Sequence, residues 1–122
     1  MRAKICHFFA CLNQTAKARR SVFRVREFKQ AEAILRPMVK EGYVKWYQKK
    51  DGMIEVTLRQ TNKGPLVRQV FQQSKPSIKK YVQHKTVKEN RRLGLTLNGS
   101  KVYTTRELKD KKLGGIYLAE VR

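Results

Sequence analysis

The sequence predicts an α+β fold, because the spacing of its apolar residues changes along the chain from a helical period to a strand period. Residues 3–41 carry apolar side chains at helical spacing, whereas much of the remainder alternates apolar and polar residues. At 122 residues the chain suits one compact domain or two small lobes that share a core.

Two amphipathic helices are expected in the N-terminal part. Residues 3–17 repeat apolar side chains at helical spacing, with Ile5 and Leu12 on one face. A second helix is expected over residues 27–41, and Gly42 is a suitable left-handed cap at its end.

A β-hairpin is expected to follow. Val44 and Trp46 alternate with a lysine, residues 51–52 (Asp-Gly) supply a tight turn, and residues 54–58 alternate again. A third antiparallel strand is expected over residues 66–71. The N-terminal half is therefore predicted to run helix, helix, three strands.

The C-terminal half is expected to be a mixed lobe with short strands and one short helix. Thr104 followed three residues later by Glu107 is a capping-box pattern, which opens a helix to about Lys112. The glycine pair at residues 114–115 would end this helix. The other expected elements are an extended segment over residues 78–82, a basic connector over residues 84–92, and strands over residues 93–97 and 116–121.

The charge of the chain indicates a polyanionic partner. There are 29 Lys and Arg residues against 9 Asp and Glu, which gives a formal net charge of +20. This charge exceeds what solubility needs, so nucleic acid is the first candidate partner. Because 40% of the residues are hydrophobic and periodic, the chain is not a disordered basic tail. No apolar run approaches the roughly 20 residues that a membrane span needs.

Few residues are suited to catalysis or to metal binding. The only histidines are His7 and His84, and no spaced carboxylate pair or phosphate-binding glycine loop is present. The spacing of Cys6 and Cys11 matches neither a zinc knuckle nor a disulfide framework, so both are interpreted as buried small residues. We expect no enzyme activity, no cofactor, no metal and no small-molecule substrate.

The predicted turns combine positive charge with hydroxyl groups. Such turns suit RNA helices, whose wide minor groove exposes 2′-hydroxyls and backbone to short polar side chains. Tyr43, Trp46 and Tyr47 are possible stacking platforms, but aromatic residues on strands are more often core, so stacking is not expected. The basic turns are Lys49-Lys50, Ser74-Lys75, Lys79-Lys80-Tyr81, Arg91-Arg92, Ser100-Lys101 and Lys111-Lys112.

Residues 74–82, SKPSIKKYV, resemble the SKPGLRVYV segment of the universal small-subunit ribosomal protein eight family. As in that family, they are followed by a Leu-Gly-Leu strand, a Ser-Lys turn, a threonine that opens a short helix, and Gly-Gly at the final strand. Residues 40–44, KEGYV, also resemble the family's KEEGFI. The order and spacing hold from about Lys4 to Arg122.

The resemblance implies two small α/β lobes packed together, over residues 1–73 and 74–122. It implies that the C-terminal lobe binds a helix in the central domain of small-subunit rRNA early in assembly, next to other small-subunit proteins. Only Ser100 and Lys101 match the family's Ser-Thr-Ser-Lys turn, and Ile116 stands where the family has the glutamate of Gly-Gly-Glu. The candidate RNA-binding residues are Ser74, Lys75, Lys79, Tyr81, Asn98, Ser100 and Lys101.

These departures from a bacterial-type pattern and the high charge favour an organellar ribosome, mitochondrial rather than plastid or bacterial. The first 26 residues are basic without any acid, as in a mitochondrial presequence. The same stretch also matches the family's first helix, and we favour its retention. The competing class is a free-standing basic nucleic-acid-binding regulator, such as a winged-helix-like DNA binder.

Overall fold

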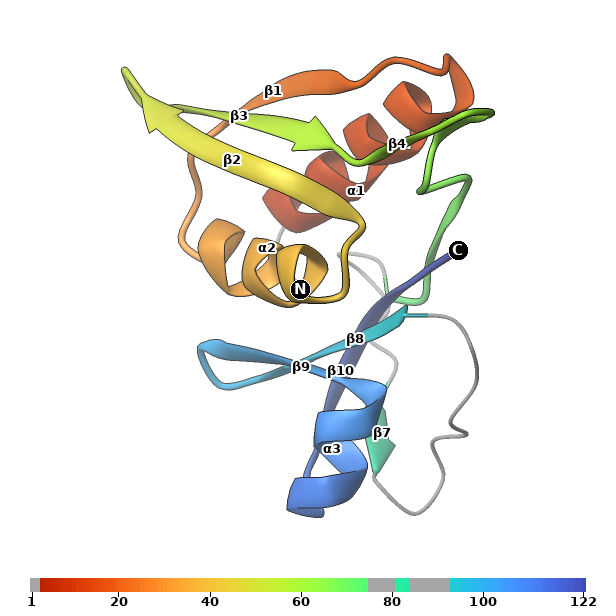
Figure 1. The fold of residues 1–122 in the computed structure, drawn as a ribbon. Coiled ribbons are helices and arrows are strands. Elements are labelled where there is room, and N and C mark those ends of the chain that lie inside the picture. Colours follow the sequence, from red (N-terminus) through yellow and green to blue (C-terminus); the bar gives the residue numbers. More distant parts are fainter. Residues whose placement is uncertain (1–2, 75–80, 84–92) are drawn as a thin grey trace.

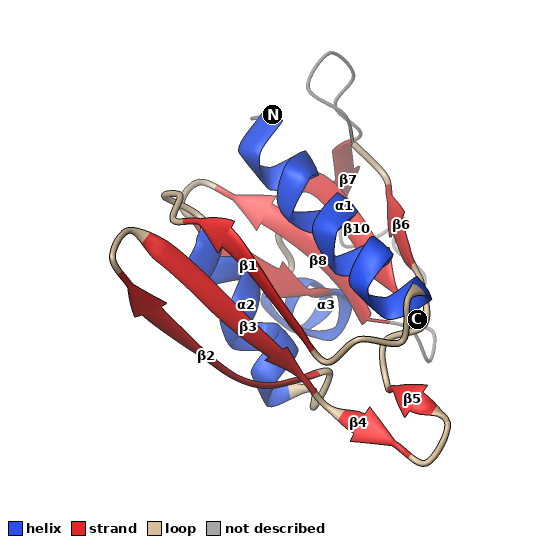
Figure 2. Ribbon diagram, turned by 90° about the horizontal axis from the view of Figure 1, so that it is seen from above, coloured by secondary structure: helices blue, strands red, loops and turns tan. Residues whose placement is uncertain are grey.

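The computed structural model describes residues 3–74, 81–83 and 93–122. It confirms the predicted α+β class and the arrangement in two lobes, one above the other in Figure 1. The upper lobe has helices on one face of a three-stranded sheet, and the lower lobe is built on a five-stranded sheet with one short helix (Figures 1 and 2). The boundary expected between residues 73 and 74 stays a prediction.

The elements follow one another along the chain. They are α1 (Ala3–Lys17), β1 (Val22–Arg26), α2 (Ala31–Lys40), β2 (Val44–Lys50), β3 (Met53–Leu58), β4 (Gln60–Thr61), β5 (Gly64–Pro65), β6 (Val70–Gln72), β7 (Tyr81–Gln83), β8 (Leu93–Asn98), β9 (Lys101–Thr104), α3 (Thr105–Lys111) and β10 (Gly114–Val121).

The first helix, α1, has the bounds that the sequence predicts and buries one face in the core. Its residues Ile5, Phe8, Phe9 and Leu12 are fully buried, and the Phe8 ring lies 5.7 Å from that of Phe23 on β1. Each such side chain contributes roughly 1.5–3 kcal/mol relative to an exposed one. Because α1 packs against β1 of one sheet and β6 of the other, one continuous core joins the lobes.

The N-terminal sheet differs from the prediction in its third strand. Its order is β1-β3-β2, with antiparallel pairs, so the third strand is residues 22–26 and not residues 66–71. The segment expected to form that strand instead contains β6, which pairs with β10 in the other sheet. The second helix accordingly begins at Ala31 rather than at residue 27.

Both predicted turns of this lobe are confirmed. Residues 51–52 have positive φ angles of 53° and 75°, as a two-residue hairpin with a type I′ turn requires. At the end of α2, Gly42 has a φ angle of 85°. The Tyr43 amide donates to the carbonyl of Met38, and the Gly42 amide donates to that of Val39. These are the two bonds of a Schellman motif.

The position of Trp46 was predicted wrongly. The register of β2 and β3 pairs Val44 with Leu58 and Trp46 with Thr57, so Lys45 is the extra residue of a β-bulge. The bulge breaks the alternation that the sequence suggests. Val44 is fully buried, whereas Trp46 is 45% exposed on the outer face of the sheet.

The C-terminal sheet has the order β6-β10-β8-β9, and β7 pairs with the remaining part of β10. The Leu93–Asn98 strand is confirmed, and the polar turn after it leads into β9, a strand that the sequence analysis did not identify. The glycine pair begins β10 instead of ending a helix. A Cβ on Gly115 would lie only 2.3 Å from the carbonyl oxygen of Leu97, so the close approach of β8 explains this glycine.

The capping box that the sequence predicts for α3 is present in full. The Glu107 amide donates to the Thr104 hydroxyl at 3.2 Å, and the Thr104 amide donates to the Glu107 carboxylate at 3.2 Å. The helix ends at Lys112, which has a left-handed φ angle of 55°. Both ends of α3 are thus set by local sequence, which fixes the connection from β9 into β10.

Candidate RNA-binding surface

The turn between β8 and β9 presents two of the predicted RNA-binding side chains to solvent. Asn98 pairs with Lys101 across the turn, and Gly99 takes a φ angle of 64° that suits glycine. Ser100 and Lys101 are both exposed. A hydroxyl and an ammonium group are therefore held side by side at the tip of a hairpin, where they can meet a 2′-hydroxyl and a phosphate.

Asn98 has a structural contact of its own. Its side-chain amide donates to the carbonyl oxygen of Gly114 at 2.7 Å, which fastens the turn to the first residue of β10. This bond leaves the side-chain oxygen of Asn98 as its remaining acceptor. The geometry therefore gives Asn98 a positioning role for Ser100 and Lys101.

Ser74 lies in a different environment from the other predicted residues. It is fully buried, and its hydroxyl donates to the carbonyl oxygen of Tyr117 on β10 at 2.6 Å. Because the side chain is fully buried, a direct contact from this hydroxyl to RNA would require the surrounding structure to open. In the described geometry the side chain of Ser74 joins the end of β6 to β10.

Tyr81 is the most exposed large apolar or aromatic side chain in the described part of the chain, at 70%. It pairs with Ile116 on β10, and Ile116 pairs in turn with Leu97 on β8. The first residues of β10 thus bring Tyr81 and the Ser100-Lys101 turn to the same end of the sheet. The side chain of Ile116 supplies no hydrogen-bond acceptor. The predicted residues Lys75 and Lys79, and the basic connector over 84–92, lie outside the described residues.

Two cations of α2 extend this surface into the N-terminal lobe. A groove with a volume of about 410 Å³ lies between α2 and β9, and its lining includes Arg36 and Lys40 on one side and Ser100 and Lys101 on the other. Both α2 cations are exposed. Sequence analysis missed them, because nothing local indicates that residues sixty or more positions apart meet across the lobes.

Tyr103 lines the same groove and carries a cation on its ring. The Lys111 ammonium lies 5.5 Å from the centroid of the Tyr103 ring, within the range of a cation–π contact. This contact places a charge from the end of α3 near the groove. The basic surface therefore draws on α2, β9 and α3 together.

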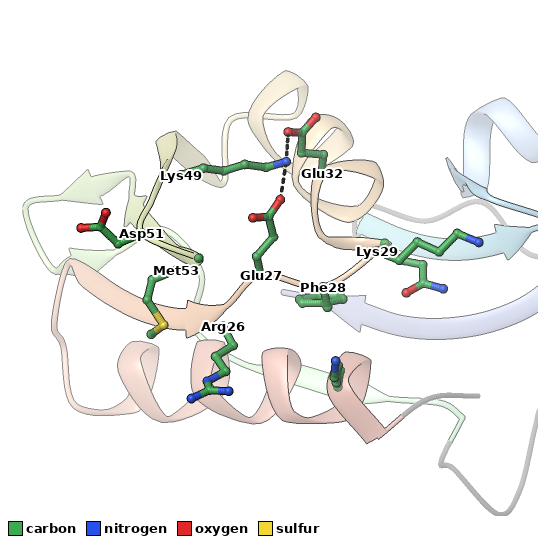
Figure 3. Close-up of a pocket in the computed structure, with 11 residues that line it drawn as sticks. Arg26, Glu27, Phe28, Lys29, Glu32, Lys49, Asp51 and Met53 are labelled. Carbon is green, nitrogen blue, oxygen red and sulfur yellow. Dashed lines mark ion pairs between the residues drawn. The ribbon is translucent and has the colours of Figure 1, made fainter.

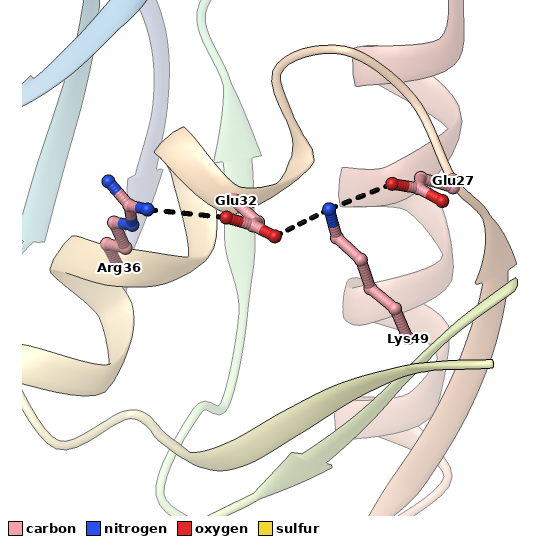
Figure 4. Close-up of polar contacts among 4 residues, drawn as sticks. All are labelled: Glu27, Glu32, Arg36 and Lys49. Atoms are coloured by element: carbon pink, nitrogen blue, oxygen red, sulfur yellow. Dashed lines mark hydrogen bonds and ion pairs between the residues drawn. The ribbon is translucent and has the colours of Figure 1, made fainter. Parts of the chain in front are cut away.

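Lys49 does not behave as the free surface charge that the basic-turn pattern suggests. Its ammonium pairs with Glu27 at 2.8 Å and with Glu32 at 2.5 Å, and Glu32 also pairs with Arg36 at 3.3 Å (Figure 4). These contacts raise the pKa of Lys49, and the hydrogen bond and charge of Lys49 lower the pKa of Glu32. The ion pairs join β2 to α2 and to the segment before it.

The pocket around these ion pairs carries charges of both signs. Arg26, Lys29, Glu27 and Asp51 all line it, and the Lys49 ammonium lies between carboxylates within it (Figure 3). Phosphate groups favour clusters of cations. The α2–β9 groove also includes two carboxylates, Glu32 and Glu107, so charge alone does not rank the two as phosphate sites.

The two cysteines are partly buried and unpaired with each other. Burial raises the pKa of both the Cys6 and the Cys11 thiols, which disfavours the thiolate that metals bind. Within residues 3–74, 81–83 and 93–122, no three His, Cys, Asp or Glu side chains form a group that could hold a metal ion. No helix in these ranges is long and apolar enough to cross a membrane.

Comparison with known proteins identifies the family. No curated protein sequence matches the chain significantly. The family model described as ribosomal protein S8 matches residues 4–122, which is nearly the whole chain and agrees with the resemblance seen in its motifs. The chain therefore belongs to the ribosomal protein S8 family, a family of small-subunit ribosomal proteins that bind rRNA.

Proposed function

We propose that this ribosomal protein binds a helix in the central domain of small-subunit rRNA through its C-terminal lobe, and that this contact supports assembly of the subunit. The observation that carries the proposal is the exposed Ser100-Lys101 turn, held against β10 by Asn98 and bordered by the cations of α2. Partner proteins of the small subunit would neighbour it in the assembled particle.

The chemistry of the surface suits a double-stranded RNA helix. Lys101 provides a phosphate contact, and the Ser100 hydroxyl can donate to or accept from a 2′-hydroxyl in the minor groove. Arg36 and Lys40 lie across the groove from this turn. Lys40 can hold the backbone of the same helix, which fixes its orientation, whereas Arg36 is paired with Glu32 at 3.3 Å.

A pair of double variants tests the proposal. Ser100→Ala with Lys101→Ala is expected to weaken binding to a central-domain rRNA fragment more than Asn62→Ala with Lys63→Ala. The control pair also removes one polar and one cationic side chain from an exposed turn, but in the N-terminal lobe between β4 and β5. Lys49→Ala is unsuitable as a control, because it would break the ion pairs to Glu27 and Glu32.

The size of the effect follows from the contacts removed. A hydrogen bond to a neutral partner contributes about 0.5–1.5 kcal/mol net, so the hydroxyl alone accounts for about a two- to tenfold loss of affinity. Filter binding measures this loss of affinity, and circular dichroism checks that the variants are folded. Equal losses from both pairs would mean that charge alone holds the RNA.

The ribosome concerned is proposed to be mitochondrial. The support is the net charge of +20 and the loss of the family's glutamate at Ile116. Microscopy of the tagged chain tests the compartment, and a cytoplasmic signal would oppose it. Sedimentation through a high-salt sucrose gradient separates the role from that of a free-standing nucleic-acid-binding regulator: a ribosomal protein stays with the small subunit, whereas a regulator washes off.

A further inference from the structure

The outer face of the N-terminal sheet carries an exposed tryptophan at a defined position. The bulge at Lys45 turns the Trp46 side chain away from the core, while its neighbour Tyr47 is half-buried against the core. Bulges of this kind re-aim side chains. In the described part of the chain, α1 and α2 lie on the other face of the sheet, and no helix covers this one (Figure 2).

The strand registers arrange the outward side chains in rows across the sheet. Successive rows lie about 7 Å apart, because two residues of a strand separate them. From β1 through β3 to β2 the rows are Val22, Thr57 and Trp46; then Arg24, Glu55 and Gln48; then Arg26, Met53 and Lys50.

This pattern does not suit a protein partner. The core of a protein interface is a contiguous apolar patch that is depleted of charge. Here a polar row separates the apolar side chains of the first row from Met53. In that polar row Arg24 donates to Glu55 at 2.8 Å, and Gln48 donates to Glu55 at 3.4 Å.

The charge of the face favours an anionic occupant. Arg24, Arg26 and Lys50 project from it, and Glu55, the one carboxylate among the outward positions of these described rows, is already bonded to Arg24. An exposed indole on a basic sheet can stack on a nucleic-acid base, and every base has a face that can stack.

We propose that this face binds a single-stranded RNA segment, with one base stacked on Trp46 and the phosphates lying along the cations of the sheet. In Figure 1 the N-terminal sheet lies on the far side of the helices from the β8–β9 turn. The chain can therefore hold an RNA helix at one end and an unpaired segment at the other. This second site does not depend on the first.

Trp46 provides its own probe, because it is the only tryptophan in the chain. Titration with a single-stranded oligoribonucleotide of about eight residues should quench its fluorescence and shield it from acrylamide. An abasic ribose-phosphate oligomer of the same length serves as the control for charge. It should leave the fluorescence nearly unchanged, and an equal response to both oligomers would overturn the stacking site.

Variants separate stacking from simple exposure of apolar surface. Binding of the same labelled oligoribonucleotide, measured by fluorescence anisotropy, should weaken about tenfold in Trp46→Ala and recover in part in Trp46→Phe. Met53→Ala is the matched control, because it removes another exposed apolar side chain from the same face. Unchanged affinity in Trp46→Ala, or an equal loss in Met53→Ala, would refute the proposal.

A cross-test keeps the two RNA sites distinct. Ser100→Ala with Lys101→Ala should leave binding of the single strand unchanged, and Trp46→Ala should leave binding of the rRNA helix unchanged. If the helix fragment fails to bind while the single strand still quenches Trp46, the C-terminal site is wrong and this one stands. If the single strand binds equally well to Trp46→Ala, the stacking site is wrong. The C-terminal site still stands in that case if the helix fragment binds and Ser100→Ala with Lys101→Ala weakens it.

Discussion

Ser74→Ala and Ser100→Ala are expected to act on different properties of the protein, although both residues were predicted to bind RNA. The Ser74 hydroxyl is fully buried and bonded to the carbonyl oxygen of Tyr117. Its removal leaves that oxygen without this donor, which costs about 1–3 kcal/mol of the free energy of unfolding. For a chain of this length each kcal/mol lowers Tm by roughly 3–6 °C.

The exposed Ser100 should behave in the opposite way. Its removal is expected to change the free energy of unfolding by less than about 0.5 kcal/mol, because it lies at a solvent-exposed turn. It should nevertheless weaken binding of the rRNA fragment about two- to tenfold through the lost hydrogen bond. Urea unfolding followed by circular dichroism measures the first quantity for both variants.

The affinity of each variant is then measured at low temperature, where both are folded. Ser74→Ala should keep an affinity close to that of the unmodified protein. The reasoning fails if the free energy of unfolding of Ser74→Ala equals that of the unmodified protein while its affinity for RNA falls as much as that of Ser100→Ala. Ser74 would then contact the RNA directly.

Three further outcomes are expected. Lys49→Met should reduce the loss of Tm on acidification. The lowered pKa of Glu32 in the folded protein gives stability that is present above the ordinary pKa of a glutamate and is lost as the pH falls through the folded-state pKa. An unchanged dependence of Tm on pH would contradict the ion-pair role. Gly115→Ala should lower Tm strongly, whereas Gly52→Ala, where a Cβ meets no atom within 4 Å, should cost only the strain of its positive φ; equal effects would argue against close packing at β8. The affinity for rRNA should fall with salt, with a log–log slope of magnitude above about 4, and a slope near zero would exclude an interface dominated by phosphates.

Elements defined by adjacent residues could be predicted from the sequence. The capping box of Thr104 and Glu107, the Asp-Gly turn at residues 51–52 and the cap at Gly42 all appear in the structure, because each depends on bonds within a few residues. The strand at residues 22–26 was missed. Its Phe23 and Val25 alternate with exposed arginines, and this period of two was available but was obscured by the basic composition.

Non-local relations could not be predicted in this way. Whether residues 66–71 join the first sheet or the second depends on the competition between β1 and β10 for partners, and no pattern within the segment decides it. The same limit applies to Ser74, which is buried and bonds to the carbonyl oxygen of Tyr117, more than forty positions away. A hydroxyl in a polar turn motif has the same sequence signal whether it is exposed or buried.

Trp46 shows how a single backbone irregularity can reverse a functional interpretation. In a regular strand Val44 and Trp46 would share the buried face, and treating Trp46 as core is correct for that geometry. One extra residue at Lys45 shifts the register and moves the ring to solvent. A strand slip of one residue exchanges the two faces, so the bulge exposes the indole without removing Val44 from the core. The proposed single-stranded RNA site therefore depends on the register of β2, and deletion of Lys45 should bury the ring or unfold the hairpin.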